Sequence, residues 1–452
     1  MKNQTLITVF IFVIISVAFA SCKKYLEAKP DQSLSVVSTL ADMQGLMDYY
    51  LNINYKEAAS GEVSTNDFYL TAADWEGRPD DERRMYTWEP DRIFALQSNP
   101  WRDTFQPVFV ANTVLASLEA QGSGAFPTDG YNEVRGQALM LRGRCLLQAL
   151  GIWCLAPGTN TDGKLGLPLR LDPDFNKLSV RSSLQQTIGQ IEKDLLEAST
   201  LMKPQSLHPL RGSRAGAYGL LARFYLYIGK FKEAGDFAGR ALSINSSLMD
   251  FNGLSQTANF PIVQFNPEVI YHSRLSSAGA LLQARARVSE ELLSLYSSDD
   301  LRKLIFFRAG TQSTTIYKGS YDGSASMFNG IAVNELLLIR AESSARVGST
   351  ELAAADLNTL LVKRWRKGTF VSLVFTNAAD ALDRVLLERR KELCFKGLRW
   401  MDIKRLNELG ANIGMKRMIN GREYTLPPRD LRFALPIPDD VITLSGMPQN
   451  PR

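Results

Sequence analysis

Apolar and small side chains recur every three or four residues through most of the chain, a period that predicts amphipathic α-helices. The pattern is clearest at 214–245, where small residues would let two helices pack closely and Gly229 would form the turn between them. The residues that carry it are Ala222, Tyr225, Gly229, Phe231, Ala234, Ala238 and Ala241. We therefore predict a mainly α-helical fold built on helix pairs.

The same pattern returns at 334–364, where Ala341, Gly348 and Ala353 repeat its small residues at the same spacing. This spacing resembles that of a tetratricopeptide (TPR) helix pair. A third stretch, near 131–155, has the apolar stripe but a poorer motif. Because a bare solenoid needs about three stacked repeats, the two clear copies predict a TPR-like scaffold whose repeats are separated by long insertions. The alternative is two helix pairs that are alanine-rich by coincidence.

The insertions collect aromatic and polar residues without a helical period, chiefly at 52–107 and 308–330. Loops on a rigid scaffold commonly carry binding residues, and an aromatic face beside polar side chains suits a sugar, which has apolar faces and hydroxyl edges. The predicted ligand-binding residues are Asn66, Asp67, Tyr69, Trp75, Arg78, Tyr317 and Tyr321. The alternative is that these rings hold the long loops against the helices. For Trp101, which precedes an amphipathic stretch, we favour packing.

The composition argues against most catalytic chemistry. The chain has only two histidines, His208 and His272, whereas imidazole is the commonest general base and metal ligand. We therefore predict no catalytic residue, no metal site and no cofactor. The 52 Lys and Arg residues exceed the 47 Asp and Glu residues by a net charge of +5, without a long basic run, which disfavours nucleic-acid binding.

The cysteines do not predict a disulfide framework. Cys145 and Cys154 lie in one predicted helix, where their Cα atoms would be about 13 Å apart, beyond bridging distance. Cys394 lies among apolar helical positions and is expected to be a buried packing residue.

The stretch 386–406 reads LLERRKELCFKGLRWMDIKRL, and its apolar residues form a helical stripe. Its paired carboxylates, Glu388 and Glu392, could suggest the acid and base of a glycosidase. The neighbouring residues Arg389, Arg390, Lys391 and Arg399 should instead keep both carboxylates ionised. We interpret the cluster as structural.

The N-terminus predicts export. Lys2 precedes an apolar run at 6–20 that is too short for a comfortable transmembrane helix, so 1–21 is expected to be a signal peptide. Cys22 directly follows small residues and resembles the acylated cysteine of a bacterial lipoprotein box. We predict a lipid anchor at Cys22 with a tether at 22–30. The alternative is an ordinary signal peptide with an incidental cysteine.

The C-terminal stretch closely resembles the signature of SusD/RagB-type lipoproteins. It shows that signature as Glu388-Arg389, Glu392-Leu393, Phe395, Gly397, Arg399-Trp400, Asp402 and Arg405. The end of the chain, with Pro436-Ile437-Pro438 and Gln449-Asn450-Pro451, resembles the terminus of the same family. Further similar stretches follow in family order along nearly the whole chain from Cys22 onwards. Lys396 departs from the signature, because Glu is common at this position in the family.

The resemblance implies a lipoprotein that faces the exterior of the cell outer membrane, binds a glycan or other nutrient, and delivers it to a SusC-like TonB-dependent transporter. It also implies a single SusD-like α-helical domain at 31–452, in which TPR-like helix pairs form the scaffold and long irregular loops form a binding face. The family is not known for catalysis. Because ligand residues vary within the family, the predicted binding residues rest on composition alone.

Two other functions stay open on the sequence. The first is a TPR-type lipoprotein whose scaffold binds a protein or peptide partner and has no sugar site. The second, which is weaker, is a helical glycosidase. Binding of a purified glycan would favour a sugar site, and release of reducing ends would favour the enzyme.

Overall fold

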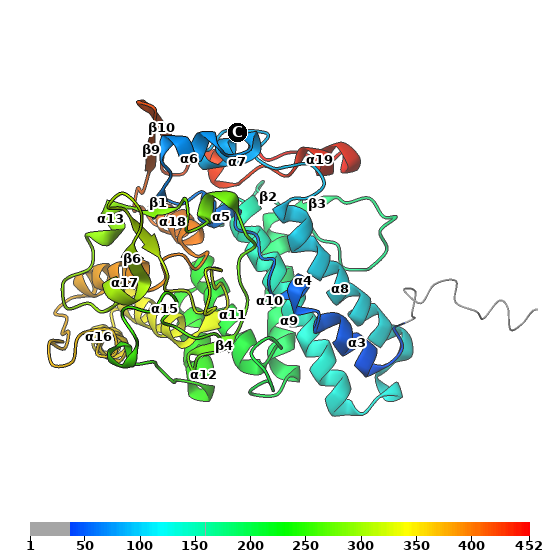
Figure 1. The fold of residues 1–452 in the computed structure, drawn as a ribbon. Helices are drawn as coiled ribbons and strands as arrows, with labels where there is room; N and C mark the ends of the chain where they lie inside the picture. Colours follow the sequence, from blue (N-terminus) through cyan, green and yellow to red (C-terminus); the bar gives the residue numbers. More distant parts are fainter. Residues whose placement is uncertain (1–36, 159) are drawn as a thin grey trace, which may run out of the picture.

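A computed structural model describes residues 37–158 and 160–452, and its elements carry the labels of Figure 1. The predicted signal peptide at 1–21, the acylated Cys22 and the tether at 22–30 lie outside these residues. In the described part, no helix is both long and apolar enough to cross a membrane. Helices dominate the structure and strands form only short pairs, which confirms the predicted mainly α-helical class.

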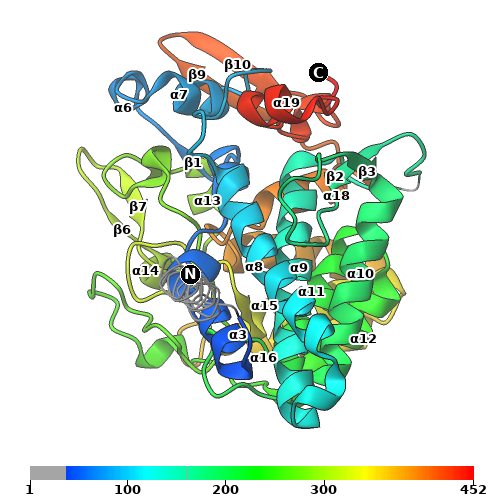
Figure 2. The ribbon, with the colours of Figure 1, turned by 90° about the vertical axis from the view of Figure 1, so that its right-hand side faces the viewer.

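Long helices form the scaffold, and most of them lie beside the next one in chain order (Figure 2). They are α8 (Pro100–Gln121), α9 (Thr128–Trp153), α10 (Leu184–Leu201), α11 (Arg214–Tyr227), α12 (Phe231–Ile244), α15 (Val333–Arg346), α16 (Thr350–Leu361), α17 (Ala378–Glu392) and α18 (Arg399–Glu408). From α8 to α12 each helix contacts its successor, α12 contacts α15, and α15 contacts α16 and α17. The scaffold is therefore one continuous stack, although the chain between α12 and α15 makes a long excursion.

Short elements occupy the insertions and the C-terminal part. The short helices are α3 (Leu40–Met47), α4 (Tyr50–Ile53), α5 (Ser60–Val63), α6 (Ala72–Glu76), α7 (Asp80–Tyr86), α13 (Glu290–Leu293), α14 (Arg302–Phe306) and α19 (Asp439–Ser445). The 3-10 turns are η2 (Ser123–Ala125), η3 (Phe251–Gly253), η4 (Gly279–Leu281) and η5 (Leu431–Phe433).

The strands pair two by two, and every pair is antiparallel. The pairs are β1 (Phe68–Tyr69) with β5 (Arg287–Val288), β2 (Leu165–Pro168) with β3 (Arg181–Ser183), β4 (Val269–Tyr271) with β8 (Ile331–Ala332), β6 (Phe307–Ala309) with β7 (Thr315–Tyr317), and β9 (Met415–Ile419) with β10 (Arg422–Leu426). Several pairs join segments that are far apart in sequence, so they fix the insertions to one another.

The predicted helix pairs are present, and a capping side chain marks the start of α11. The side chain of Ser213 accepts a hydrogen bond from the N–H of Gly216 and caps α11. Gly229 ends the first helix of the α11–α12 pair with φ +79°, and Gly348 does the same for α15–α16 with φ +83°. Both glycines therefore adopt the left-handed backbone conformation that a side chain disfavours.

Replacing Gly229 or Gly348 with alanine is expected to lower the free energy of unfolding by about 1 kcal/mol in each case. An added Cβ at either position would meet no atom within 4 Å, so the cost comes from the backbone conformation. Gly189 in α10 has equally open surroundings but a helical backbone. Gly189→Ala should therefore raise stability by about 0.5–1 kcal/mol. Urea unfolding measures the change in the free energy of unfolding for all three variants. A change of the same sign in all three would contradict the left-handed backbone conformation of Gly229 and Gly348.

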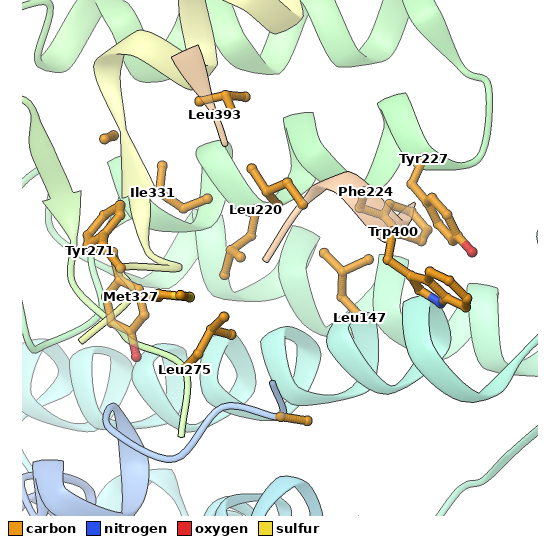
Figure 3. Close-up of a cluster of buried hydrophobic side chains, with 14 of the residues drawn as sticks. Leu147, Leu220, Phe224, Tyr227, Tyr271, Leu275, Met327, Ile331, Leu393 and Trp400 are labelled. Carbon is orange, nitrogen blue, oxygen red and sulfur yellow. The ribbon is translucent and has the colours of Figure 1, made fainter. Parts of the chain in front are cut away.

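The main hydrophobic core connects the scaffold with the insertions. Figure 3 shows side chains of α9 and α11 facing Leu275, Met327 and Ile331 of the long insertion, and Trp400 of α18. These four side chains are at least nine-tenths buried. Because burial of apolar surface drives this packing, the insertions are held in defined positions on the helices.

The helical stripe predicted at 386–406 is interrupted, which corrects that expectation. α17 ends at Glu392 and α18 begins only at Arg399. Between them Phe395 has φ +57° and Gly397 has φ +72°, which a continuous helix does not contain. The bend directs the N–H of Gly397 to the Glu62 carboxylate at 2.9 Å. A contact with a distant segment therefore overrides the local helical pattern.

Candidate functional site

The paired carboxylates of the C-terminal motif lie in the protein interior. Glu388 accepts a hydrogen bond from Arg302 at 2.5 Å, and Glu392 accepts one from Arg364 at 2.9 Å. Burial alone raises the pKa of Glu392, but the charges of Arg364 and Arg302 hold it below its usual value. Both glutamates are fully buried, so a glycan cannot reach them. The structural interpretation of this cluster is confirmed.

Of the basic residues adjacent to these glutamates in sequence, Lys391 pairs with Glu388 as expected, at 3.3 Å, whereas Arg389 and Arg390 have other partners. Arg389 pairs with Asp402 at 2.8 Å, and Arg390 pairs with Glu291 at 2.6 Å. Successive residues of a helix point in different directions, so sequence neighbours are rarely partners. The other cations that neutralise the glutamates are Arg302 and Arg364, which come from distant segments, and Arg384, which lies one turn before Glu388 in α17.

Metal and thiol chemistry find no support in the described part of the chain. Across residues 37–158 and 160–452, no group of His, Cys, Asp and Glu side chains could hold a metal ion. The described cysteines are free and buried: Cys145, Cys154 and Cys394. Burial raises the pKa of Cys154 to about 11, which keeps this thiol protonated near neutral pH.

A hollow with a volume of about 870 Å³ lies beside the β9–β10 hairpin. We call it the hairpin hollow. In both ribbon views the hairpin lies over β1 and α13 (Figures 1 and 2). The lining residues are Asn66, Phe68, Tyr69, Leu70, Tyr86, Ser289, Glu291, Asn412, Gly414, Met415, Lys416, Arg417, Met418, Thr425, Leu426, Pro427 and Pro428. A pocket of this size with mixed apolar and polar walls can take a ligand of several rings.

Asn66 and Tyr69 are the predicted binding residues that line the hairpin hollow. The side chain of Tyr69 is exposed, with 38% of its surface open, because the two residues of β1 alternate between the core and solvent. Asn66 donates a hydrogen bond to Glu291 at 3.3 Å. The exposed ring of Tyr69 and the hydrogen-bonded pair of Asn66 and Glu291 therefore line the same hollow.

The buried side chain of Asp67 holds Arg390, the partner of Glu291, in place. It is fully buried and accepts hydrogen bonds from Arg390, the shorter at 3.0 Å. Arg390 in turn donates to Glu291 at 2.6 Å. Burial raises the pKa of Glu291, but the hydrogen bond and charge of Arg390 outweigh it and lower this pKa below its usual value. Glu291 therefore presents a negative charge in a fixed position.

Three of the predicted residues are not accessible to a ligand, which corrects the expectation of a surface role. Asp67 is the buried partner described above. Tyr317 is buried and stacks on Phe395 with ring centroids 4.6 Å apart. The fully buried Tyr321 donates its hydroxyl hydrogen bond to Glu268 at 2.7 Å. The physical reason is that residues 316–322 of this loop are buried, so the two rings complete the core.

Trp75 and Arg78 lie outside the hairpin hollow. The Trp75 indole donates to the carbonyl of Arg83 at 3.2 Å, and its ring packs partly against the core. The Arg78 guanidinium lies 3.9 Å from Glu82 and beside Gly279 of η4. Both side chains are half-buried and stabilise the α6–α7 segment.

The hairpin itself was missed at the sequence level, although a signal was present. That signal is Asn420-Gly421, a pair typical of a two-residue hairpin turn, and both residues adopt a positive φ. The alternation of buried and exposed positions along Met415–Ile419 appears only in the structure, where Arg417 is buried and Met418 is exposed. Arg417 anchors the hairpin, because its guanidinium donates to the carbonyls of Val63, Thr65 and Tyr86. The hairpin's Lys416 and Met418 thereby become part of the hollow.

Sequence comparison places two family models on the chain. A family described as starch-binding and associating with the outer membrane matches residues 24–226. The SusD family matches residues 313–452. No curated protein has significant sequence similarity to the chain.

Solved structures share the fold along nearly the whole chain. A SusD superfamily protein from Bacteroides thetaiotaomicron has a TM-score of 0.76 at 19% identity and covers 92% of this chain and 100% of its own. One from Bacteroides vulgatus has a TM-score of 0.72 at 21% identity, covering 92% and 99%. A SusD-like carbohydrate binding protein from Bacteroides vulgatus has a TM-score of 0.67 at 18% identity, covering 90% and 97%. The two family matches together span most of the chain, which therefore belongs to the SusD/RagB family, and the solved structures share its fold.

Proposed function

We propose that the protein binds a glycan in the hairpin hollow and delivers it to a SusC-like TonB-dependent transporter. The observation that carries the proposal is the open ring of Tyr69 beside Asn66 and Glu291 in a hollow of about 870 Å³. A sugar ring can stack on the tyrosine face while its hydroxyl groups meet the amide and the carboxylate. The family membership and the carbohydrate-binding relative support the same assignment.

The proposed location is the outer face of the outer membrane, with a lipid chain on Cys22 as anchor. The sequence around Cys22 supports the anchor, and the description of the matching family as associating with the outer membrane supports the location. Mass spectrometry of the N-terminal peptide from the native host tests it. An acylated Cys22 is the expected result, and a free thiol or a cut at another residue would contradict the proposal.

Binding without catalysis fits the described residues, because the carboxylate pair of the C-terminal motif is buried and neutralised by arginines. Incubation with a panel of polysaccharides should release no reducing ends. The alternative is a protein or peptide ligand on the TPR-like scaffold. A complete absence of glycan binding across neutral and acidic polysaccharides would favour that alternative.

Tyr69→Ala is expected to weaken binding of the recognised glycan about tenfold, because the ring supplies the apolar face that stacks on the sugar. Isothermal titration calorimetry against a panel of plant and host glycans first identifies the ligand and then compares the variants. Tyr49→Ala is the matched control, since Tyr49 is 55% exposed and lies outside the hollow. An unchanged affinity in Tyr69→Ala would place the glycan elsewhere.

A further inference from the structure

A second hollow, of about 380 Å³, shares no lining residue with the hairpin hollow. We call it the Tyr55 hollow. Its lining residues are Tyr55, Lys56, Asp103, Arg274, Leu275, Ser276, Ser277, Ala278, Leu281, Leu282, Gln283, Ala325, Ser326 and Met327. These residues come from the end of α4, the start of α8 and two parts of the long insertion. Segments far apart in sequence therefore converge on a concave surface that the glycan proposal does not use.

The side chain of Arg274 is held in place before any ligand arrives. Its guanidinium carbon lies 3.8 Å from the centroid of the Tyr55 ring, so the planar group covers the ring face. Its Nη1 group donates to Asp322 at 3.1 Å. The Tyr55 hydroxyl accepts a hydrogen bond from Gln264 at 2.9 Å, which fixes the ring in turn. Binding would therefore cost little side-chain entropy at this arginine.

Asp322 is the buried support of this arrangement. Besides Arg274 it is contacted by Ser324, which donates at 2.5 Å, and by Gln264, which donates at 3.3 Å. The Nε2 atom of His272 also lies 3.3 Å from the carboxylate. Burial raises the pKa of Asp322, but His272, Ser324 and Arg274 outweigh it and hold the pKa below its usual value. The negative charge of Asp322 is thus paired within the protein, and Asp322 itself is not a lining residue of the Tyr55 hollow.

The guanidinium keeps donor groups for a ligand. Within the described residues, the side chain of Arg274 makes no hydrogen bond other than the one from Nη1, and it is 27% exposed. Lys56 adds an exposed cation to the lining, and the one acidic side chain among the lining residues is the half-buried Asp103. Burial raises the pKa of Asp103, against the lowering effect of Lys56 and Arg102. Leu281, Leu282 and Met327 supply apolar surface to the lining.

We propose that the Tyr55 hollow is a second ligand site that takes a carboxylate-bearing sugar. The free edge of Arg274 would receive the carboxylate in a two-point hydrogen bond, and Lys56 would contribute a second positive charge. Ser276 and Ser277 offer hydroxyl groups to the ring hydroxyls, and the leucines cover an apolar face. A hexuronic acid carries this combination of groups.

Calorimetry of the purified protein with galacturonate, galactose and an oligogalacturonate tests the proposal. Galacturonate should bind at least about tenfold more tightly than galactose, because the uncharged sugar leaves the guanidinium edge unpaired. Lys56→Gln changes an exposed side chain and should weaken galacturonate binding about threefold. Arg274→Gln should weaken it about tenfold or more. If only the oligogalacturonate binds, and Arg274→Gln weakens it, the site takes a uronate within a polymer.

Two controls separate this site from the hairpin hollow. Tyr69→Ala should leave galacturonate affinity unchanged, and Arg274→Gln should leave the affinity for a hairpin-hollow glycan unchanged, because the two linings share no residue. Leu282→Trp alters an exposed side chain of the Tyr55 hollow and should block galacturonate sterically. Equal binding of galacturonate and galactose would overturn the proposal. So would an affinity that neither Lys56→Gln nor Arg274→Gln changes.

Discussion

Arg302→Met is expected to lower the free energy of unfolding by about 3–5 kcal/mol. The Arg302 guanidinium is fully buried and donates to Asp300 at 2.7 Å, to Glu388 at 2.5 Å and to Glu392 at 3.3 Å. Methionine fills a similar volume but leaves these carboxylates with too little positive charge in a medium of low dielectric constant. Urea unfolding followed by circular dichroism measures the loss.

Arg366→Met is the matched control for this prediction. Arg366 pairs with Asp299 at 3.2 Å, but both side chains are largely exposed, at 53% and 41%. Because water screens exposed ion pairs, the control should cost less than about 1 kcal/mol. A loss in Arg302→Met as small as that in the control would mean that the remaining cations, among them Lys391 and Arg364, are enough to neutralise the buried carboxylates. Arg302 would then contribute little to the stability of the fold.

Glu62→Gln is expected to be more stable than the parent protein at alkaline pH by on the order of 4 kcal/mol. Glu62 is 1% exposed, and one of its carboxylate oxygens has no hydrogen-bond partner in the described part of the chain. Burial and the negative charge of Asp67 raise its pKa to about 8, although Gly397 and Arg399 lower it. The side chain is therefore protonated near neutral pH.

The sign follows from proton binding in the two states. The pKa of Glu62 is about 8 in the folded protein, against 4.5 for an unperturbed glutamate. Between these values the folded state holds a proton that the unfolded state has released, so the free energy of unfolding falls as the pH rises through this window. Glutamine does not titrate, so the variant lacks this decline.

Denaturation series from pH 5 to pH 9 measure the difference between Glu62→Gln and the parent. Glu119→Gln changes an exposed glutamate and should decline with pH like the parent. The stability of Glu62→Gln should diverge from both as the pH rises. Parallel curves for all three proteins would show that Glu62 is already ionised in the folded state.

The helix pairs could be predicted because their determinants are local. The small residues of α11 and α12 recur at fixed short spacings along the sequence, and they are buried where the two helices pack. The left-handed turn at Gly229 lies between the two helices. The break between α17 and α18 could not be predicted in the same way. The hydrogen bond from Gly397 to Glu62 joins residues 335 positions apart, and no local pattern reports such a contact.

The candidate site was predicted only in part, because the same residue types serve packing and binding. Tyr69 and Tyr321 both occur in polar, aromatic-rich stretches, but Tyr69 is open and Tyr321 is fully buried. Tyr321 is enclosed by Glu268, to which it donates, and by Lys396, whose amino group lies 3.5 Å from the ring centroid. Glu268 lies 53 positions before Tyr321, and Lys396 lies between α17 and α18, so composition alone cannot distinguish the two tyrosines.

The sequence by itself determined the helical class, the repeated helix pairs and the family motifs, because these depend on residues that are close together along the chain. Only the tertiary structure decided which side chains line a hollow. Asn66 reaches Glu291 because β1 pairs with β5, and Asp67 holds Arg390 of α17 behind them. The hairpin hollow and the Tyr55 hollow both exist because distant segments meet, and their position is set by burial of the core rather than by local sequence.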